Sequence, residues 1–578
     1  MAEEHCLKIF AEDSNKANTF PSVIQIWYST KPEGPSLSWT TDQDGQPCVF
    51  TVGHLLSNRS LFPSQDSPSA LSSWQASVTV DENLSVLMTG DHLPTILTKD
   101  SGRRKFCYAT SYPMPSSTFA LAIGSWKMEE VVPVSVHELE HMSVPPIRLI
   151  FPECLREITS ALLQWYLPRS FLNVQALLGV YPFHRLDVLI VPACFDSLGM
   201  ASPSLLFLSQ SVLCPDHSMC VRVAHELCHT WFGLITGPLD WTEEWLTEGF
   251  CTYLEDILHA QVCEMGTETE SYMDLRAELH LRLLKGELSH TDDELQTLRP
   301  NRGENSAYVG TGETCFLKNG MNTVKVFMQV HYLKGYFLLH ELEHHVGRNQ
   351  FLSFLRKYLQ KFAHKLVTSQ DFLNLFFETF PDVRTDAFSV DTIYSDWLDH
   401  AGLPKVLMSS ENGGRLRSEE SKKRANQIAQ QLAQLKDMDA RARKRKRKYE
   451  GCKNSLATLE KLEWPVQIML LFDQLLEEEN LTGGTLDLLK EIYHRHFENA
   501  EVFHRWCELV IKHKRRKYFS DVRDFWRRHQ AMGVYLYGEA MISEDPDITK
   551  MARDCFRQLQ HDMPASVRET VSSMLFPS

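Results

Sequence analysis

The sequence lacks any apolar run of about 18 residues, the length that a helix needs to cross a bilayer. Its first residues, MAEEHCLKIF, also lack the apolar core of a secretory signal. The 14 cysteines have no paired spacing, so we expect reduced thiols rather than a disulfide framework. These absences predict a protein without a membrane span that resides in the cytoplasm and the nucleus.

The size and charge of the chain set further bounds. At 578 residues the chain is too long for one hydrophobic core, and about two to four domains are expected. Its hydrophobic fraction of 43% is that of an ordinary globular protein. The net charge of −15 argues against nucleic-acid binding by the protein as a whole, but it leaves room for a local basic site.

The segment His225-Glu226-Leu227-Cys228-His229 has the HExxH pattern. Residues four apart share one face of a helix, so both imidazoles can reach one metal ion. Glu226 lies beside them, where a carboxylate can take a proton from a water molecule on that ion. The flanking residues are apolar at helical spacing, with no Pro or Gly before Gly233. The plainer alternative is a buried helix with two hydrogen-bonded histidines.

A second helix is predicted after the turn at Gly237–Pro238. It begins near Asp240 or Thr242, and it carries Glu244 and Glu248 one turn apart. Either carboxylate can complete a His-His-Glu site, and three protein ligands leave a fourth position open, as in catalytic zinc sites. Spacing alone does not choose between the two glutamates.

The spacing of these motifs resembles that of the gluzincin zinc aminopeptidases, in the branch of leukotriene hydrolase and aminopeptidase B. Eighteen residues separate HELCH from the glutamate of WLTEGF. The resemblance implies one Zn²⁺ per chain, held by His225, His229 and Glu248, with Glu226 as the catalytic general base. It also implies that Glu255 supports a ligand histidine through a hydrogen bond, which fixes the orientation of the ring.

The same resemblance reaches Tyr332, in QVHYLKGYFLL, and implies a catalytic tyrosine that donates a hydrogen bond to the tetrahedral oxyanion. Without the family, a core or capping tyrosine would be the plainer interpretation.

Residues 197–202, SLGMAS, stand where the family has its substrate-cleft motif GxMEN. Gly199 and Met200 are kept, and their backbone groups can bind a peptide as an added strand. Ala201 replaces the glutamate that in the family binds the α-amino group of the substrate, and alanine cannot bind an ammonium. We therefore expect weaker or differently anchored amine recognition, with Asp196 or a carboxylate from elsewhere as the substitute.

The patterns predict a multidomain α+β protein. The expected parts are a β-rich N-terminal domain (residues 1–142, with strands such as 22–29 and 118–126), a thermolysin-like mixed α/β zinc catalytic domain (143–406), a linker (407–420) and a helical, armadillo-like α-solenoid of helix hairpins (421–578). The family's N-terminal domain is saddle-shaped and usually longer by several dozen residues. We therefore expect a truncated domain with an open sheet edge.

A dense basic run, RARKRKRK, occupies residues 441–448, and KKR precedes it at 422–424. Such a run is usually a solvated, mobile segment. Inside an acidic protein, this density favours a nuclear or nucleolar address, or contact with RNA or an import receptor. Contact with RNA would be electrostatic and non-specific, because the sequence has no RNA-binding motif.

These features predict a zinc metallopeptidase that hydrolyses the N-terminal peptide bond of peptides, with a basic first residue preferred as in the aminopeptidase B branch. The alternative is a weakly active or inactive peptidase scaffold whose basic helical region binds RNA or protein in the nucleus. The replaced glutamate, the short N-terminal domain and the basic run support the alternative. The enzyme is favoured, because three metal ligands, a general base and Tyr332 rarely occur together by chance in a protein without this activity.

Overall fold

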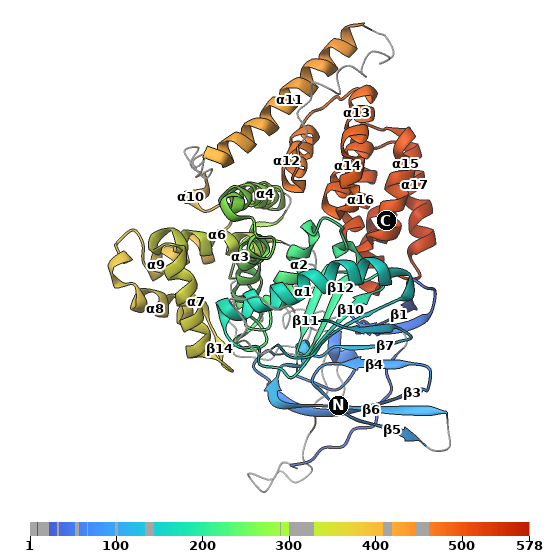
Figure 1. Cartoon of the computed structure of the whole chain (residues 1–578), viewed down its shortest axis with the longest axis vertical. Helices are drawn as coiled ribbons and strands as arrows, with labels where there is room; N and C mark the ends of the chain where they lie inside the picture. Colours follow the sequence, from blue (N-terminus) through green and yellow to red (C-terminus); the bar gives the residue numbers. More distant parts are fainter. Residues whose placement is uncertain are drawn as a thin grey trace.

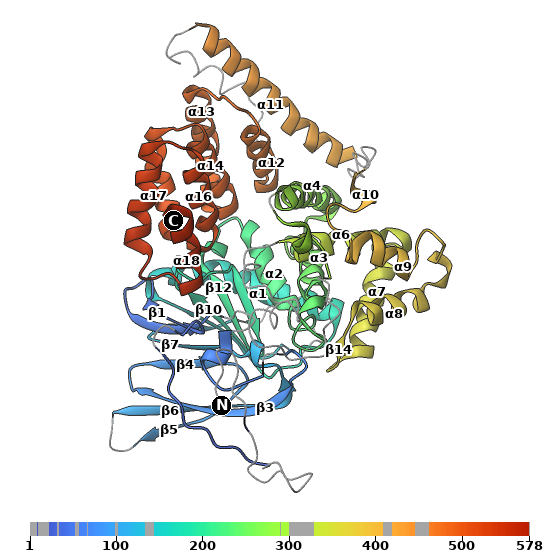
Figure 2. The same cartoon turned by 180° about the vertical axis from the view of Figure 1, so that it is seen from behind.

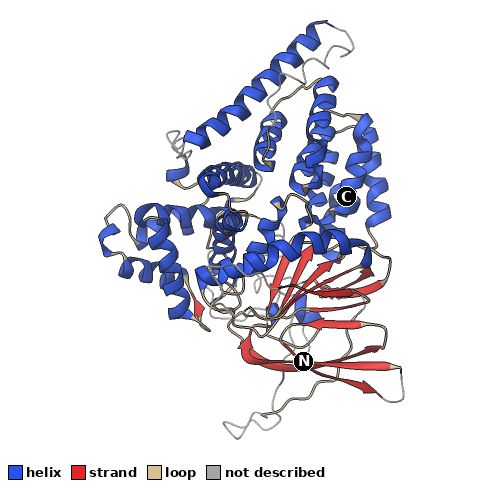
Figure 3. Cartoon of the chain, in the orientation of Figure 1, coloured by secondary structure: helices blue, strands red, loops and turns tan. Residues whose placement is uncertain are grey.

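The computed structural model describes residues 9, 22–31, 34–52, 57–65, 67–98, 102–132, 144–289, 291–299, 329–408, 419–445 and 462–576. The strands gather in the N-terminal and central parts of the chain, whereas the remaining parts are helical (Figures 1 and 3). The predicted fold class, with a β-rich N-terminal part, a mixed catalytic part and a helical C-terminal part, is confirmed. No helix in the described ranges is long and apolar enough to cross a lipid bilayer.

The N-terminal part contains two antiparallel sheets. One has the strand order β1-β2-β7-β4 and the other β3-β6-β5. The strands are β1 (Leu37–Thr41), β2 (Pro47–Thr51), β3 (Ser72–Asp81), β4 (Ser85–Met88), β5 (Asp91–Thr98), β6 (Arg103–Met114) and β7 (Leu121–Gly124). Strand β1 is at one end of its sheet in the described part of the chain, and Trp39 on it is 64% exposed.

The strand predicted at residues 22–29 is wrong. The chain runs there without a partner strand among the described residues, and Val23 and Trp27 are 79% and 81% exposed. An alternating pattern buries its apolar face only when a neighbouring strand supplies the backbone hydrogen bonds. The pattern alone could not supply that neighbour.

A five-stranded mixed sheet, with the order β11-β12-β10-β9-β8, forms the base of the central part. Strand β8 (Lys127–Glu130) comes from the range predicted as N-terminal and pairs with β9 (Ile147–Phe151). The other strands are β10 (Leu186–Val191), β11 (Gly199–Ser202) and β12 (Leu205–Ser209). Strand β10 is buried along its whole length, as expected for a central strand between parallel neighbours. Strand β11 is at the edge of the sheet, so one side of its backbone has no strand partner in the described ranges.

Helices cover this sheet and extend away from it (Figures 1 and 2). They are α1 (Arg156–Leu178), α2 (Val221–Cys228), α3 (Trp245–Val262), α4 (Thr269–Ser289), α6 (Val330–Val346), α7 (Arg348–Phe362), α8 (Ser369–Thr379), α9 (Val390–Ile393) and α10 (Lys405–Met408). Two short strands, β13 (Gly237–Pro238) and β14 (Leu366–Val367), pair with each other in parallel. One hydrophobic core joins the sheet to helices α1, α2, α3, α6, α7 and α8.

The C-terminal part is a stack of helix hairpins, as predicted. Helices two apart along the chain pack together, in the pairs α12 with α14, α14 with α16 and α16 with α18. The helices are α11 (Glu419–Arg445), α12 (Pro465–Leu476), α13 (Gly483–Tyr493), α14 (Ala500–Lys512), α15 (Phe519–Arg528), α16 (Gln530–Ile542), α17 (Pro546–Leu559) and α18 (Ala565–Leu575).

Helix α11 carries the first part of the basic run and projects from the body of the molecule in both views (Figures 1 and 2). It packs against α4 and α12. The helix ends at Arg445, and residues 446–448 lie outside the described residues, as does most of the predicted linker.

Candidate active site

Helix α2 positions the HExxH side chains. Its residues are almost all buried, and both His225 and Glu226 lie inside the protein at 4% and 6% exposure. His229 follows directly after the last helical residue. The chain then turns at Gly233, whose φ of +127° favours glycine, and leads towards α3. The short helix therefore ends just before the second histidine.

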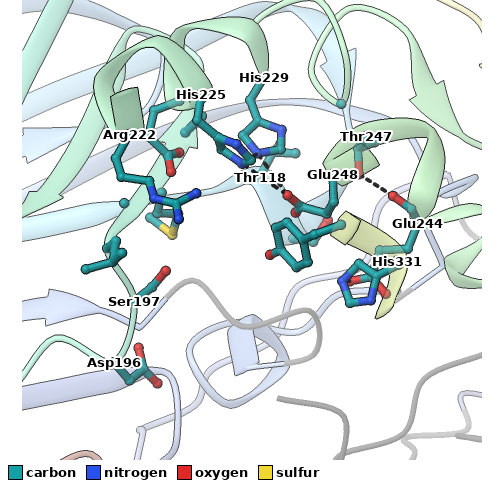
Figure 4. Close-up of a pocket in the computed structure, with 18 of the residues that line it drawn as sticks. Thr118, Asp196, Ser197, Arg222, His225, His229, Glu244, Thr247, Glu248 and His331 are labelled. Carbon is teal, nitrogen blue, oxygen red and sulfur yellow. Dashed lines mark hydrogen bonds and ion pairs between the residues drawn. The ribbon is translucent and has the colours of Figure 1, made fainter. Parts of the chain in front are cut away.

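The structure brings His225, His229 and Glu248 together at the junction of α2 and α3 (Figure 4). The Nε2 atoms of the two histidines are 3.1 Å apart, and each lies 3.3 Å from Oε2 of Glu248. The three ligand atoms lie within 4.8 Å of one another, which is a spacing that one metal ion can bridge. Among the described residues, no other group of three such side chains is placed in this way.

The second nitrogen of each imidazole faces an acceptor. Nδ1 of His225 is 2.8 Å from Oε2 of Glu255, and Nδ1 of His229 is 3.1 Å from the carbonyl oxygen of Phe232. A carboxylate and a carbonyl only accept hydrogen bonds, so each Nδ1 carries the proton. In the neutral rings, both Nε2 atoms then present lone pairs to the same point as Glu248.

Three possible ligand atoms that converge on one point attract a cation, either a proton shared with Glu248 or a metal ion. Burial alone would lower the pKa of His225, but hydrogen bonds to Glu248 and Glu255 raise it to about 10. Burial alone would likewise raise the pKa of Glu248, but the imidazoles of His229 and His225 lower it far below its usual range. The cluster thus favours positive charge at its centre.

The predicted supporting residue Glu255 is fully buried in a network of charges. Besides His225, it contacts Nη1 of Arg222 at 3.1 Å and Nη2 of Arg276 at 3.2 Å. Burial would raise the pKa of Glu255, but Arg222, His225 and Arg276 lower it to about 2. The arginines therefore keep Glu255 ionised, so that it holds the His225 ring in one orientation.

The same network reaches the helical C-terminal part. Nη2 of Arg222 lies 3.4 Å from Oε1 of Glu501 on α14. Sequence reasoning missed Arg222, Arg276 and Glu501. Arg222 could have been found, because it lies three residues before His225 on the same helical face. The other two lie far along the chain, and no local pattern marks them.

Glu226 packs directly against the edge strand. A Cβ atom built on Gly199 would lie 2.5 Å from Cδ of Glu226, closer than real contacts allow. Burial raises the pKa of Glu226, which brings a carboxylate closer to the range of a general base. The close approach places the backbone of β11 beside the candidate base.

Tyr332 comes to the cluster from α6. Its ring is stacked near the ring of His225, with the centroids 6.1 Å apart. Burial raises the pKa of Tyr332 well above its usual value, so the phenol stays protonated and can donate a hydrogen bond.

Helix α6 crosses α3 closely at Gly335 and Gly249, where a Cβ on Gly249 would lie 3.0 Å from Cα of Gly335.

Glu244, the other glutamate that spacing allowed, faces a different partner. Its Oε1 lies 3.5 Å from Nε2 of His331. It lines the same cavity but does not belong to the cluster of His225, His229 and Glu248 (Figure 4). The tertiary structure therefore separates two carboxylates that spacing left equivalent, and it agrees with the choice of Glu248 that the family resemblance implies.

A cavity of about 430 Å³ opens beside these residues. All three parts of the chain line it: the N-terminal part with Thr118, the central part with the cluster and β11, and the C-terminal part with Met532 and Tyr535. Gly199, Met200 and Ala201 form part of its wall. The methyl group of Ala201 brings no charge to that wall.

Comparison with known proteins supplies the family. The peptidase family M1 domain matches residues 172–397, and the C-terminal domain of leukotriene A4 hydrolase matches residues 465–575. Human aminopeptidase O is 40% identical over 99% of this chain and 72% of its own length. The chain belongs to peptidase family M1.

Other relatives agree with this assignment. Mouse aminopeptidase B is 26% identical over 94% of this chain and 77% of its own length. The structure of yeast LTA4 hydrolase in complex with bestatin has a TM-score of 0.75 at 20% identity, and it covers 95% of this chain and 81% of that one. An intact HELCH motif together with Ala201 favours a relationship to aminopeptidase O, which the comparison confirms.

Proposed function

We propose that this protein is a zinc-dependent aminopeptidase that hydrolyses the N-terminal peptide bond of peptides. The observation that carries the proposal is the convergence of His225 Nε2, His229 Nε2 and Glu248 Oε2, with Glu226 beside them in the cavity wall. The related proteins named aminopeptidase O and aminopeptidase B support the same activity.

The donor set fits zinc. Two neutral imidazole nitrogens and one carboxylate oxygen are ligands that Zn²⁺ prefers, and three protein ligands leave a position open for a reactant. His225, His229 and Glu248 would hold the ion, with one site per chain. Bound there, zinc supplies Lewis-acid chemistry that peptide hydrolysis needs.

The side chains of the protein perform the remaining steps. Glu226 takes a proton from the attacking water and later passes it to the departing amine. The protonated phenol of Tyr332 donates a hydrogen bond to the oxyanion that develops on the scissile carbonyl. Glu255, held by Arg222 and Arg276, keeps the His225 ring oriented.

Strand β11 offers the substrate a docking edge. The backbone groups on its outer side, which no described strand pairs with, can pair with an extended peptide. Gly199 then holds that peptide beside Glu226. The alternative function, an inactive scaffold, is not favoured, because the candidate base and the three metal-type ligands are all placed together.

The test uses the purified, zinc-replete chain and matched peptides with free and acetylated amino ends. Cleavage of the free peptides alone, lost in Glu226→Gln, is the expected result. Cleavage of both kinds of peptide would instead indicate an endopeptidase or an amine-blind enzyme. If the zinc-bound chain cleaves neither kind of peptide, the result supports the inactive-scaffold alternative.

A preference for a basic first residue is a further part of the proposal. Three carboxylates of the cavity wall, those of Asp196, Glu226 and Glu244, support it, because acidic side chains attract a substrate cation. Arginyl substrates should be cleaved faster than leucyl substrates. Equal rates would contradict this preference.

We also propose that the basic run at 441–448 directs the protein to the nucleus and nucleolus, by contact with an import receptor or non-specifically with RNA. The density of basic residues and the projecting position of α11 support this. Replacing the six basic residues of this run that follow Ala442 with glutamine should shift a fluorescent fusion to the cytoplasm. Unchanged nuclear accumulation would contradict the assignment.

A further inference from the structure

One acidic side chain in the cavity wall has an oxygen without a partner among the residues that the structure describes. Asp196 lines the cavity together with Ser197 and Leu198, just before strand β11. Its Oδ2 atom is enclosed by protein and forms no hydrogen bond within the described part of the chain. Figure 4 shows Asp196 and Ser197 away from the metal-type cluster, on the side opposite Glu244 and His331.

Other acids of the wall differ from Asp196 in this respect. Glu248 lies between two imidazoles, and Glu244 lies against His331. Burial raises the pKa of Asp196 to about 7, and among the described residues no cation counteracts this effect. A charged carboxylate with an enclosed oxygen that lacks a hydrogen bond among the described residues is costly, and the cost falls when a cation binds.

The position of Asp196 relative to β11 decides what can reach it. Gly199 lies against Glu226, so this point of the strand is level with the scissile bond of a peptide paired with β11. Asp196 lies three residues earlier, at most about 10 Å away along an extended chain. An extended substrate would therefore bring one of its first few residues next to Asp196.

We propose that Asp196 binds a positively charged group of the peptide substrate and thereby selects cationic peptides. The inference rests on the proposed aminopeptidase function and names a specificity residue for it. A bound ammonium or guanidinium supplies the donor that the carboxylate lacks, in a charge-assisted hydrogen bond. Rotation about the soft Cβ–Cγ torsion of aspartate can present either oxygen to the ligand.

Two sources can supply the cation: a lysine or arginine side chain, or the α-ammonium of the substrate. The test measures peptide binding by calorimetry to the zinc-replete full chain carrying Glu226→Gln, which prevents turnover. One series compares lysine with norleucine at the first, second and third positions. A second series compares free with acetylated amino ends. If Asp196→Asn removes the preference for lysine over norleucine, the side chain supplies the cation. If it removes the preference for the free over the acetylated amino end, the α-ammonium supplies it.

The expected result is a preference of about 10- to 100-fold for the cationic member of one pair, since hydrogen bonds to charged groups are of that strength. Asp196→Asn should abolish this preference and leave the neutral member within about twofold of its original affinity. Asp196→Glu should retain most of it, because the charge is kept. Ser197→Ala, which changes a neighbouring uncharged wall residue, should retain all of it.

The proposal is overturned if Asp196→Asn discriminates as well as the parent, if both members of each pair weaken equally, or if no pair is discriminated at all. Its failure can be told from failure of the proposed function. Cleavage without any cation preference would remove the role of Asp196 and leave the peptidase. If binding is cation-selective and depends on Asp196, but the chain with Glu226 intact cleaves no peptide, the role of Asp196 stands and the peptidase function fails.

Discussion

Gly249 and Gly335 meet backbone to backbone where α3 crosses α6. A Cβ on Gly335 would lie 2.9 Å from Cα of Gly249, which is too close for either helix to keep its place. Glu248 precedes Gly249 directly, and Tyr332 lies about one turn before Gly335. The crossing therefore fixes the distance between a candidate metal ligand and the candidate oxyanion donor.

Gly335→Ala should separate the two helices and displace Tyr332 from the cluster. We expect kcat to fall about 100-fold, since loss of one oxyanion donor has an effect of this size, and the melting temperature to fall as well. Steady-state kinetics and thermal unfolding check both. Gly286→Ala is the matched control, because Gly286 lies in α4 with open space around it, and alanine there should be neutral or stabilising. Full activity in Gly335→Ala would contradict the role of the crossing.

Gly199→Ala should displace the candidate general base Glu226 and not Tyr332. The new methyl group would push the Glu226 carboxylate out of its position, because it would lie 2.5 Å from Cδ. We expect kcat to fall by about 100-fold or more, while zinc binding stays within a few fold of the parent. Zinc titration with a competing chelator separates the two effects. Equal loss of zinc affinity and activity would mean that the whole cluster had moved.

Zinc should stabilise the parent against heat, and Glu248→Ala should remove most of this effect. A ligand at 100 times its dissociation constant stabilises a folded protein by about 2.7 kcal/mol. Glu244→Ala is the matched control from one turn earlier on the chain, and it should respond to zinc as the parent does. Scanning calorimetry with and without zinc measures the shifts. If Glu244→Ala lost the response and Glu248→Ala kept it, the choice between the glutamates would be reversed.

Glu255→Gln should weaken both folding and zinc binding. It leaves the buried guanidinium groups of Arg222 and Arg276 without their shared carboxylate, and breaking a buried charge pair costs about 3–5 kcal/mol. Zinc affinity should fall about 10- to 100-fold as the His225 ring loses its support. Glu501→Gln removes the 3.4 Å contact to Arg222 but keeps Glu255 in place, so it should have a smaller effect. The exposed Glu498→Gln should change the melting temperature little, and an equal effect of all three variants would argue against the network.

The preference for cationic peptides should depend on pH near neutrality. Burial raises the pKa of Asp196 to about 7, so its carboxylate is charged above that pH and neutral below it. The ratio of kcat/KM for a lysine peptide to that for its norleucine counterpart should therefore rise between about pH 6 and pH 8. The ratio cancels titrations that affect both peptides equally. It should stay flat in Asp196→Asn, and a flat ratio in the parent would contradict the assignment.

Much of the site could be predicted from the chain because its parts are local. His225, Glu226 and His229 lie within five residues, where helical periodicity alone places them on neighbouring faces. Tyr332 and Glu255 needed the family resemblance, because no spacing rule connects them to the histidines. The choice of Glu248 over Glu244 needed it as well, because spacing left both possible. The strand expected at residues 22–29 was wrong for the opposite reason. Its local pattern was right for a strand, but no partner strand lies beside it in the described part of the chain.

The sequence by itself determined the family, the three-part architecture and the pair of histidines, because apolar periodicity and short motifs express local geometry. Only the tertiary structure decided that Glu244 faces His331 instead of the histidine pair, that Arg222 links Glu255 to Glu501, and that Asp196 has an oxygen without a partner among the described residues. These three facts depend on how helices and strands from distant parts of the chain pack. Burial and charge act through distances in space, which separations along the chain do not fix.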